Sequence, residues 1–328
     1  MNRTLVSCAL AFACASAACT GKYKRAVTDE KVERTPARLA RGDYLVNQLS
    51  GCGGCHTSRE TGNLLAESER ADKFLAGGNW LPDAVAPIFI PNITQDTETG
   101  LGAWSDDEIM RSIRDGIHKD GHILLPMMPS NQFQHYSDED IRSIVAYLRT
   151  VPPVKQPRMG ETKLPFMPNL LFRTIGVHLH APVGKVPDPD KKNADAYGLY
   201  VARIGACTDC HSLTDKGPRK EDDPLFMAGS ESPFSDPKLG KVWARNLTPD
   251  PETGLGKYSA EQIKQAIRTA TTLDGHKMAP PMSIMMAHYS GITDEDLDAL
   301  IHWLKTLKPV KRLVPPRELT PAMQAAYP

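Results

Sequence analysis

The sequence has few aromatic residues: phenylalanine, tryptophan and tyrosine together make up 6% of its 328 residues. It also lacks net charge, because 39 lysine and arginine residues balance 39 aspartate and glutamate residues. A neutral chain has no global positive field of the kind that attracts nucleic acid, so we expect no nucleic-acid partner. With 41% hydrophobic and 24% charged residues, the composition is typical of globular proteins. The length indicates about two domains.

Long apolar runs are also missing, apart from a short one near the N-terminus. There, a positively charged start precedes an apolar run and a stretch of small residues that ends at Cys19. This pattern is typical of an export signal and is too short for a membrane-spanning helix. Ala17-Ala18-Cys19 resembles a bacterial lipobox, whereas Ala15-Ser16-Ala17 fits ordinary signal peptidase. We expect a signal peptide at 1–18, a polar tether at 19–35, a lipid on Cys19, and a location on the periplasmic side of a bacterial membrane.

The chain has seven cysteines, an odd number. Cys8 and Cys14 lie in the expected signal peptide, and Cys19 lies at its end. The other four lie in two motifs, Cys52-Gly-Gly-Cys55-His56 and Cys207-Thr-Asp-Cys210-His211. Cys-x-x-Cys-His is the attachment sequence of c-type haem. One helical turn brings the two thiols to the vinyl groups of a porphyrin, and the next residue presents its imidazole to the iron.

A single motif of this kind is also compatible with a disulfide, a redox dithiol or half of a zinc site. Two motifs in an exported chain, with no further cysteine, favour two covalently bound haem c groups. The candidate thioether residues are Cys52, Cys55, Cys207 and Cys210, and the candidate axial ligands of iron are His56 and His211.

Both motifs belong to a tandem repeat. The segment from Asn92 to Gly102, which begins Asn-Ile-Thr, returns at 246–256 as Asn-Leu-Thr. Asp120-Gly-His122 returns as Asp274-Gly-His276, and other shared pairs are Gly42-x-Tyr44 with Gly198-x-Tyr200 and His135-Tyr-Ser with His288-Tyr-Ser. Repetition of several motifs in the same order predicts two similar domains rather than one.

Helix caps recur in the same order. Ser105 and Ser259 each begin a capping box, and Ser137 and Thr293 precede acidic residues and a stripe of apolar residues at helical spacing. We found no convincing alternating strand pattern, so we expect an all-α fold of two small domains. The expected boundaries are a first domain at 36–152, an inter-domain strap at 153–194, a second domain at 195–312 and a tail at 313–328.

Each repeat also has a proline- and methionine-rich loop between its capped helices. Aligning Pro126 with Pro280 places Met128 on Met282, and we expect these two residues to be the second axial ligands of iron. Neighbouring methionines compete for this role, namely Met127 in the first repeat and Met278, Met285 and Met286 in the second. A bis-histidine alternative is also open, with His122 and His276 or with His135 and His288.

The quoted motifs, together with Glu98-Thr-Gly-Leu-Gly-Ala-Trp104 and the segment Lys163-Leu-Pro-Phe-Met-Pro-Asn169, resemble those of class I c-type cytochromes. Residues 36–312 are similar to the dihaem part of the cytochrome subunits of periplasmic alcohol and gluconate dehydrogenases. Those subunits usually carry a third haem unit and a C-terminal membrane helix, whereas this chain ends soon after its second unit. The second methionine loop also departs from the pattern, with Ser283 in place of a proline.

Iron held by histidine and methionine has no open position, so the expected function is outer-sphere electron transfer rather than catalysis. The expected partners are a redox donor and an acceptor, such as a dehydrogenase or a membrane respiratory complex. The alternative is a dihaem enzyme of the cytochrome c peroxidase type, which needs one open iron position and an acid–base residue beside it.

Overall fold

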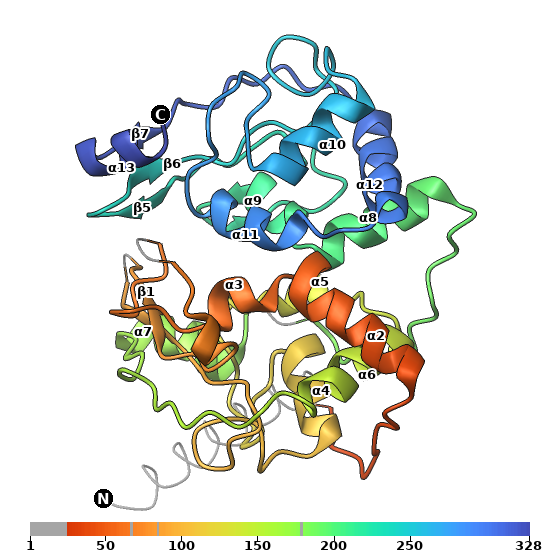
Figure 1. Ribbon diagram of the computed structural model, residues 1–328, viewed down its shortest axis with the longest axis vertical. Coiled ribbons are helices and arrows are strands. Elements are labelled where there is room, and N and C mark those ends of the chain that lie inside the picture. Colours follow the sequence, from red (N-terminus) through yellow and green to blue (C-terminus); the bar gives the residue numbers. More distant parts are fainter. Residues whose placement is uncertain (1–24, 66–67, 84, 178–179) are drawn as a thin grey trace, which may run out of the picture.

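The computed structural model describes residues 25–65, 68–83, 85–177 and 180–328. Two lobes follow one another along the long axis of the molecule, the first repeat in one and the second repeat in the other, and the strap runs between them (Figure 1). Cys19 and the expected signal peptide lie outside the described residues. Within those residues, no helix has the length and apolar character that a membrane span requires.

Each α-helix of the first lobe has a counterpart in the second. In the first they are α2 (Pro36–Tyr44), the π-helix η1 (Leu45–Leu49), α3 (Cys52–His56), η2 (Ala71–Lys73), α4 (Asp106–Arg114), α5 (Ser130–Phe133) and α6 (Asp138–Leu148). In the second they are α8 (Ala194–Ile204), α9 (Cys207–His211), α10 (Ala260–Thr269), α11 (Met282–Tyr289) and α12 (Asp294–Thr306). The strap contains α7 (Phe166–Pro168) and η3 (Asn169–Ile175), and α13 (Pro321–Ala326) lies near the C-terminus.

The expected caps are confirmed. Ser105 and Ser259 begin α4 and α10 with complete capping boxes, in which the serine side chain and the third helical residue exchange hydrogen bonds with each other's backbone. Ser137 and Thr293 cap α6 and α12 through their hydroxyl oxygens. These capping bonds involve residues three positions apart, so the sequence pattern alone is sufficient to predict where the helices begin.

Short strands are present that the sequence pattern did not indicate. Among the described residues they form three small antiparallel sheets: β1 (Asn79–Leu81) with β2 (Ile88–Ile90), β3 (Leu213–Thr214) with β4 (Gly217–Pro218), and β5 (Phe234–Asp236) with β6 (Gly240–Val242) and β7 (Glu318–Leu319). Strands of two or three residues are too short to show an alternating pattern. Because β7 lies in the expected tail, that segment is in part an edge strand of the second lobe.

In each lobe the first and last helices cross at a glycine. A Cβ atom on Gly42 of α2 would lie 2.0 Å from the carbonyl oxygen of Ser143 in α6. At the corresponding place, a Cβ atom on Gly198 of α8 would lie 2.2 Å from the carbonyl oxygen of Ala299 in α12. Only glycine permits such a close approach of two backbones. The first residue of the Gly-x-Tyr motif is therefore required by the helix crossing.

The tyrosine of the same motif reaches into the other repeat. Tyr44 donates a hydrogen bond to Asp296 of α12 at 2.5 Å, and Tyr200 donates one to Asp140 of α6. The same two hydroxyls also accept hydrogen bonds from helix-capping residues. The backbone N–H of Thr293 donates to Tyr44, and that of Ser137 donates to Tyr200. The two repeats thus exchange equivalent contacts, and a single hydrophobic core extends over both.

The strap and the last part of the expected tether both pack against the first lobe. Val154 accepts a hydrogen bond from Asn92, the hydroxyl of Thr162 accepts one from the N–H of Phe89, and Asp138 and Val186 exchange two. Residues 25–32 bind the start of α4, where the N–H groups of Thr28 and Val32 donate to acidic side chains. By contrast, Phe166 and Met167 in the strap are exposed.

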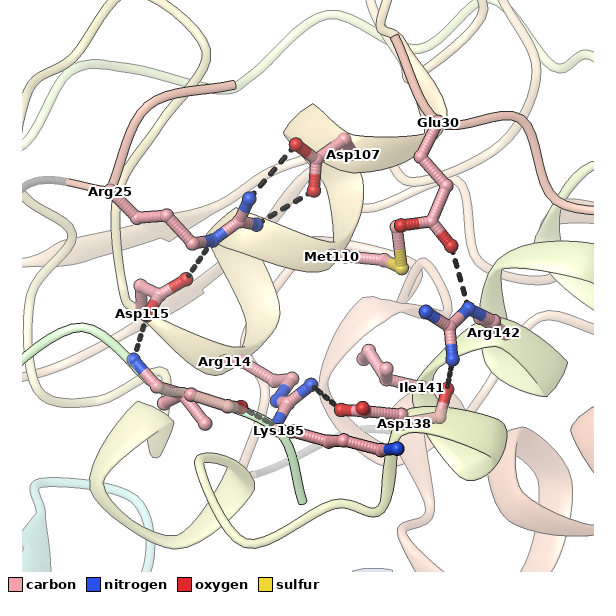
Figure 2. A pocket seen from close by; sticks show the side chains of 12 residues that line it. Arg25, Glu30, Asp107, Met110, Arg114, Asp115, Asp138, Ile141, Arg142 and Lys185 are labelled. Atoms are coloured by element: carbon pink, nitrogen blue, oxygen red, sulfur yellow. Dashed lines mark hydrogen bonds and ion pairs between the residues drawn. The ribbon is translucent and has the colours of Figure 1, made fainter. Parts of the chain in front are cut away.

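A cavity of about 550 Å³ lies where these segments meet α4 and α6 (Figure 2). Ion pairs surround it: Arg25 with Asp107 and Asp115, Arg142 with Glu30, and Arg114 with Asp138. In the second lobe, Arg268 and Asp294 form the ion pair that corresponds to Arg114 and Asp138. The cavity is lined largely by paired charges that tie the N-terminal segment and the strap to the first lobe, and it contains none of the Cys-x-x-Cys-His residues.

We expect Tyr44→Phe and Tyr200→Phe each to lower the free energy of unfolding by about 1.5–3 kcal/mol, because each leaves a buried carboxylate without a donor from the other repeat. Denaturant titration of the intact protein measures the change. Tyr258→Phe is the control, since the contacts of Tyr258 with Lys305, through its backbone carbonyl, and with Lys257, through its ring, do not use the hydroxyl. Losses equal to that of the control would contradict the interpretation.

Candidate functional site

The two Cys-x-x-Cys-His motifs form two short helices, α3 and α9. Each follows a residue in the left-handed conformation, Gly51 with φ 55° and Ala206 with φ 54°. This turn separates the motif from the preceding helix. Both motifs therefore place two thiols and one imidazole on a single helical turn, as the spacing predicted.

The imidazoles of both motifs are held through the same nitrogen. Nδ1 of His56 lies 2.9 Å from the carbonyl oxygen of Pro91, and Nδ1 of His211 lies 2.7 Å from that of Arg245. Burial lowers the pKa of both histidines, which favours the neutral ring. A neutral imidazole that donates Nδ1–H to a carbonyl presents the lone pair of Nε2, which is the usual arrangement of a metal-binding histidine.

The repeated Asn-x-Thr motif positions these carbonyl groups. Pro91 and Arg245 directly precede Asn92 and Asn246. Each asparagine side chain donates to a backbone carbonyl beyond its domain's last helix, Val154 at 2.7 Å and Val310 at 2.8 Å. The motif therefore has a structural task, and the sequence similarity of the two copies follows from it.

The thiol groups have properties that oppose a disulfide and a redox dithiol as alternatives to haem. No disulfide joins the described cysteines. Burial raises the pKa of Cys52, Cys207 and Cys210 to about 12. A redox dithiol requires a thiolate, so the low acidity of these groups disfavours it.

The two candidate methionine ligands lie in different local structures. Met128 is half-buried in the turn before α5, as expected for a loop residue. Met282 is instead the first residue of α11, so the second methionine segment is largely helical. Met128 and Met282 both pack against the common core, and so does Met285, whereas the neighbouring Met127 is 45% exposed. Exposure makes Met127 a poorer ligand than Met128.

The histidines of the bis-histidine alternative have other partners. Both ring nitrogens of His288 are engaged, Nδ1 with the carbonyl oxygen of Asn47 and Nε2 with Glu69, each at 3.0 Å. The ring of His122 binds Asp120, and His276 is exposed. The contacts of His288 and His122 and the exposure of His276 favour methionine as the second ligand.

Each Cys-x-x-Cys-His helix contacts the methionine segment of the other repeat. Asp209, inside the second motif, accepts hydrogen bonds from Asn131 and Gln132 of α5 at 3.0 and 2.9 Å. His288 of α11 lies against the two glycines of the first motif, where a Cβ atom on Gly53 would be 2.8 Å from its ring. Burial is the main cause of the raised pKa of Cys210, followed by the charges of Asp209 and Cys207. The charge of Cys55 in the first motif also raises this pKa, so thiols of the two motifs lie within electrostatic range.

A pair of arginines in the strap shows a local excess of positive charge. Partial burial and the like charge of Arg173 lower the pKa of Arg158, and the charge of Arg158 in turn lowers the pKa of His56. Within the described chain, neither arginine forms an ion pair, and the buried Nε of Arg173 has no hydrogen-bond partner. Haem carries two anionic propionates, so its charge fits this site.

Sequence reasoning missed these arginines because they have no counterparts in the repeat pattern. It also missed Asp209, Glu69 and His288 as interface residues. Repetition singled out the tyrosines and the acidic residues that follow Ser137 and Thr293. It did not show which tyrosine pairs with which aspartate, because each pair spans the two repeats.

Comparison with known proteins agrees with the geometry. The cytochrome c family model matches the chain twice, at residues 39–152 and 195–308. The chain is 28% identical over 293 residues to the fructose dehydrogenase cytochrome subunit of Gluconobacter japonicus, which covers 86% of this chain and 56% of that protein. It is 30% identical to the cytochrome c subunit of the quinone alcohol dehydrogenase of Komagataeibacter europaeus, covering 84% of this chain and 57% of that subunit.

A third relative is closer in length. The chain is 23% identical to a dihaem c-type cytochrome of Cereibacter sphaeroides, covering 80% of this chain and 83% of that protein. By contrast, it spans little more than half the length of the two dehydrogenase subunits.

The ion pair between His288 and Glu69 predicts a pH-dependent interface. Burial opposes the charge of His288, but Glu69 and the Asn47 carbonyl outweigh it and raise the pKa. A raised pKa gives stability that is complete below the unfolded value of about 6.5 and is lost as pH rises through the folded value. Between about pH 6 and about pH 9, we expect the free energy of unfolding of the wild type to fall by roughly 1 kcal/mol more than that of His288→Gln. Denaturant titrations at both pH values measure this difference.

Glu69→Gln is the matched control, because it removes the carboxylate and keeps the shape of the side chain. In that background the pH dependence attributed to His288 should disappear. An unchanged pH profile in either variant would show that the pair does not control stability in this range.

Proposed function

Because the chain belongs to the cytochrome c family, we propose that it is a dihaem cytochrome that carries electrons from a donor to an acceptor and is not itself an enzyme. The main observation is the pair of helices α3 and α9, each with two thiols and an imidazole held through Nδ1 by a backbone carbonyl. Their proximity across the interface supports a relay between two centres in one chain.

We assign the residues as follows. Cys52 and Cys55, and likewise Cys207 and Cys210, form the thioether bonds, His56 and His211 provide one axial ligand each, and Met128 and Met282 provide the other. Bound haem c supplies a one-electron Fe(II)/Fe(III) couple. With two protein ligands at each iron, no position remains for a substrate, which supports an electron carrier over a peroxidase.

The hydrogen bonds between the two repeats support this relay by fixing the distance between the two sites. Electron tunnelling slows steeply with distance, so the two sites must keep a constant separation. The hydrogen bonds of Asp209 with Asn131 and Gln132, and that of His288 with Glu69, join the ligand-bearing segments of opposite repeats. They hold both sites in one arrangement as partners dock and leave.

We expect Met128→Ala and Met282→Ala each to convert one of two low-spin haems to high spin, because each opens one axial position. Absorption and magnetic spectra of the purified protein measure the spin states. Met127→Ala and Met285→Ala are the neighbouring controls and should leave both haems low-spin. A high-spin haem in Met127→Ala or Met285→Ala would instead identify the substituted methionine as the axial ligand. A high-spin haem that reacts with peroxide in the wild type would support the alternative function of a dihaem peroxidase.

The partners follow from the relatives. Two of them are named as cytochrome subunits of fructose and alcohol dehydrogenases, so the proposed donor is a dehydrogenase that oxidises a small metabolite. The proposed acceptor is a component of the respiratory chain. The lipobox-like Ala17-Ala18-Cys19 supports a lipid anchor on the periplasmic side of a bacterial membrane.

Purification from detergent-solubilised native membranes tests this assignment. We expect a dehydrogenase to accompany the protein and the haem absorption to change to the reduced form when that enzyme's substrate is added. Mass spectrometry of the N-terminal peptide reports lipidation of Cys19, and Cys19→Ser should release the protein to the soluble fraction. A protein that purifies alone and is reduced by none of the membrane dehydrogenases would contradict the proposed donor.

A further inference from the structure

The loop after α4 brings two imidazoles and a carboxylate together. Nδ1 of His118 lies 3.0 Å, and Nδ1 of His122 lies 2.7 Å, from the same oxygen, Oδ1 of Asp120. One ligating atom from each of the three residues lies within 4.8 Å of the other two. The two rings stack with their centroids 4.3 Å apart and their planes inclined by 23°. Three potential metal-binding atoms therefore surround one point.

The backbone of the loop holds these residues in place. The N–H of His118 donates to the carbonyl of His122, and the N–H of Gly121 donates to that of His118, both at 2.9 Å. Ile117 and Ile123, on either side, are buried against each other. The ring of Trp104 contacts His118 edge-on, with the centroids 4.6 Å apart. A metal ion would thus meet ligands whose positions are already restricted.

We propose that His118, Asp120 and His122 bind a divalent metal ion such as Zn²⁺. Two imidazole nitrogens and one carboxylate oxygen are ligands typical of Zn²⁺. Neighbouring ligands of a tetrahedral zinc ion with bonds of about 2.0–2.1 Å lie about 3.4 Å apart, so each of the two imidazole nitrogens must move less than about 1 Å away from the oxygen of Asp120. Each ring would accept the metal at Nδ1 and keep its hydrogen on Nε2.

The remaining coordination positions face solvent. The side chain of Asp120 is 59% exposed and that of His122 is 35% exposed. Water or a side chain of another protein can therefore complete the coordination. This site uses none of the assigned haem ligands, so absence of bound Zn²⁺ would overturn the metal site and leave the proposed electron transfer unaffected.

The second repeat provides an internal control. Its loop has the same backbone bonds, from Thr272 N–H to the carbonyl of His276 at 2.7 Å and from Gly275 N–H to that of Thr272 at 2.9 Å. Thr272 replaces His118, and its hydroxyl binds Asp274 at 2.5 Å. With one imidazole and one carboxylate only, this loop lacks a ligand, and we expect no metal site there.

Isothermal titration calorimetry with Zn²⁺ tests the proposal on the full-length, haem-loaded protein, freed of its affinity tag and treated with chelator. We expect one Zn²⁺ per chain. His118→Ala should weaken binding by more than about tenfold, since loss of a second-shell partner alone costs 10–100-fold. The matched control His276→Ala should bind as the wild type does. An unchanged haem spectrum shows that each variant is folded.

A gain of binding is the stronger test. Thr272→His restores the third ligand in the second loop, so this variant should bind two Zn²⁺ per chain. Absence of a saturable site in the wild type would overturn the proposal, and so would wild-type affinity in His118→Ala. A single Zn²⁺ bound to Thr272→His would contradict the claim that these three residues on this loop form a site.

Discussion

Asp140 and Asp296 are buried carboxylates near the start of the last helix of each repeat, and the arrangement of the two repeats depends on their hydrogen-bond donors. Asp296 accepts from Tyr197 of its own repeat and from Tyr44 of the other. Asp140 accepts from Arg41 of its own repeat and from Tyr200 of the other. Burial of a carboxylate is costly unless its hydrogen bonds are complete, so the tyrosine of the other repeat stabilises each terminal helix.

This dependence connects the fold to the proposed electron transfer. The glycine two positions before each tyrosine lets the first and last helices cross closely, and the tyrosine then extends to the opposite repeat. Docking in this way brings each Cys-x-x-Cys-His helix against the methionine segment of its neighbour, through Asp209 on one side and His288 on the other. A relay between two centres requires such a constant geometry, which a flexible tandem pair would lack.

Much of the fold and part of the site could be predicted from local spacing. The capped helices, the helical turns of the two Cys-x-x-Cys-His motifs and membership of the cytochrome c family are confirmed. The short strands and the helical start at Met282 were missed, because strands of two or three residues show no period and the helix α11 has apolar residues on every side. The pairing of His288 with Glu69 was missed because nothing in the spacing of either residue indicates the other.

Residues close together along the chain define the chemistry of this protein: four thiols and two imidazoles in two equivalent turns, repeated caps, and a loop with two histidines and an aspartate in the first repeat only. These features depend on residues a few positions apart, whose distances the covalent chain restricts. Tertiary structure decided how the repeats meet, and hence which carbonyl holds each histidine and which tyrosine reaches each aspartate. Tyr44 and Asp296 are 252 positions apart, and only the packing of both lobes brings such residues together.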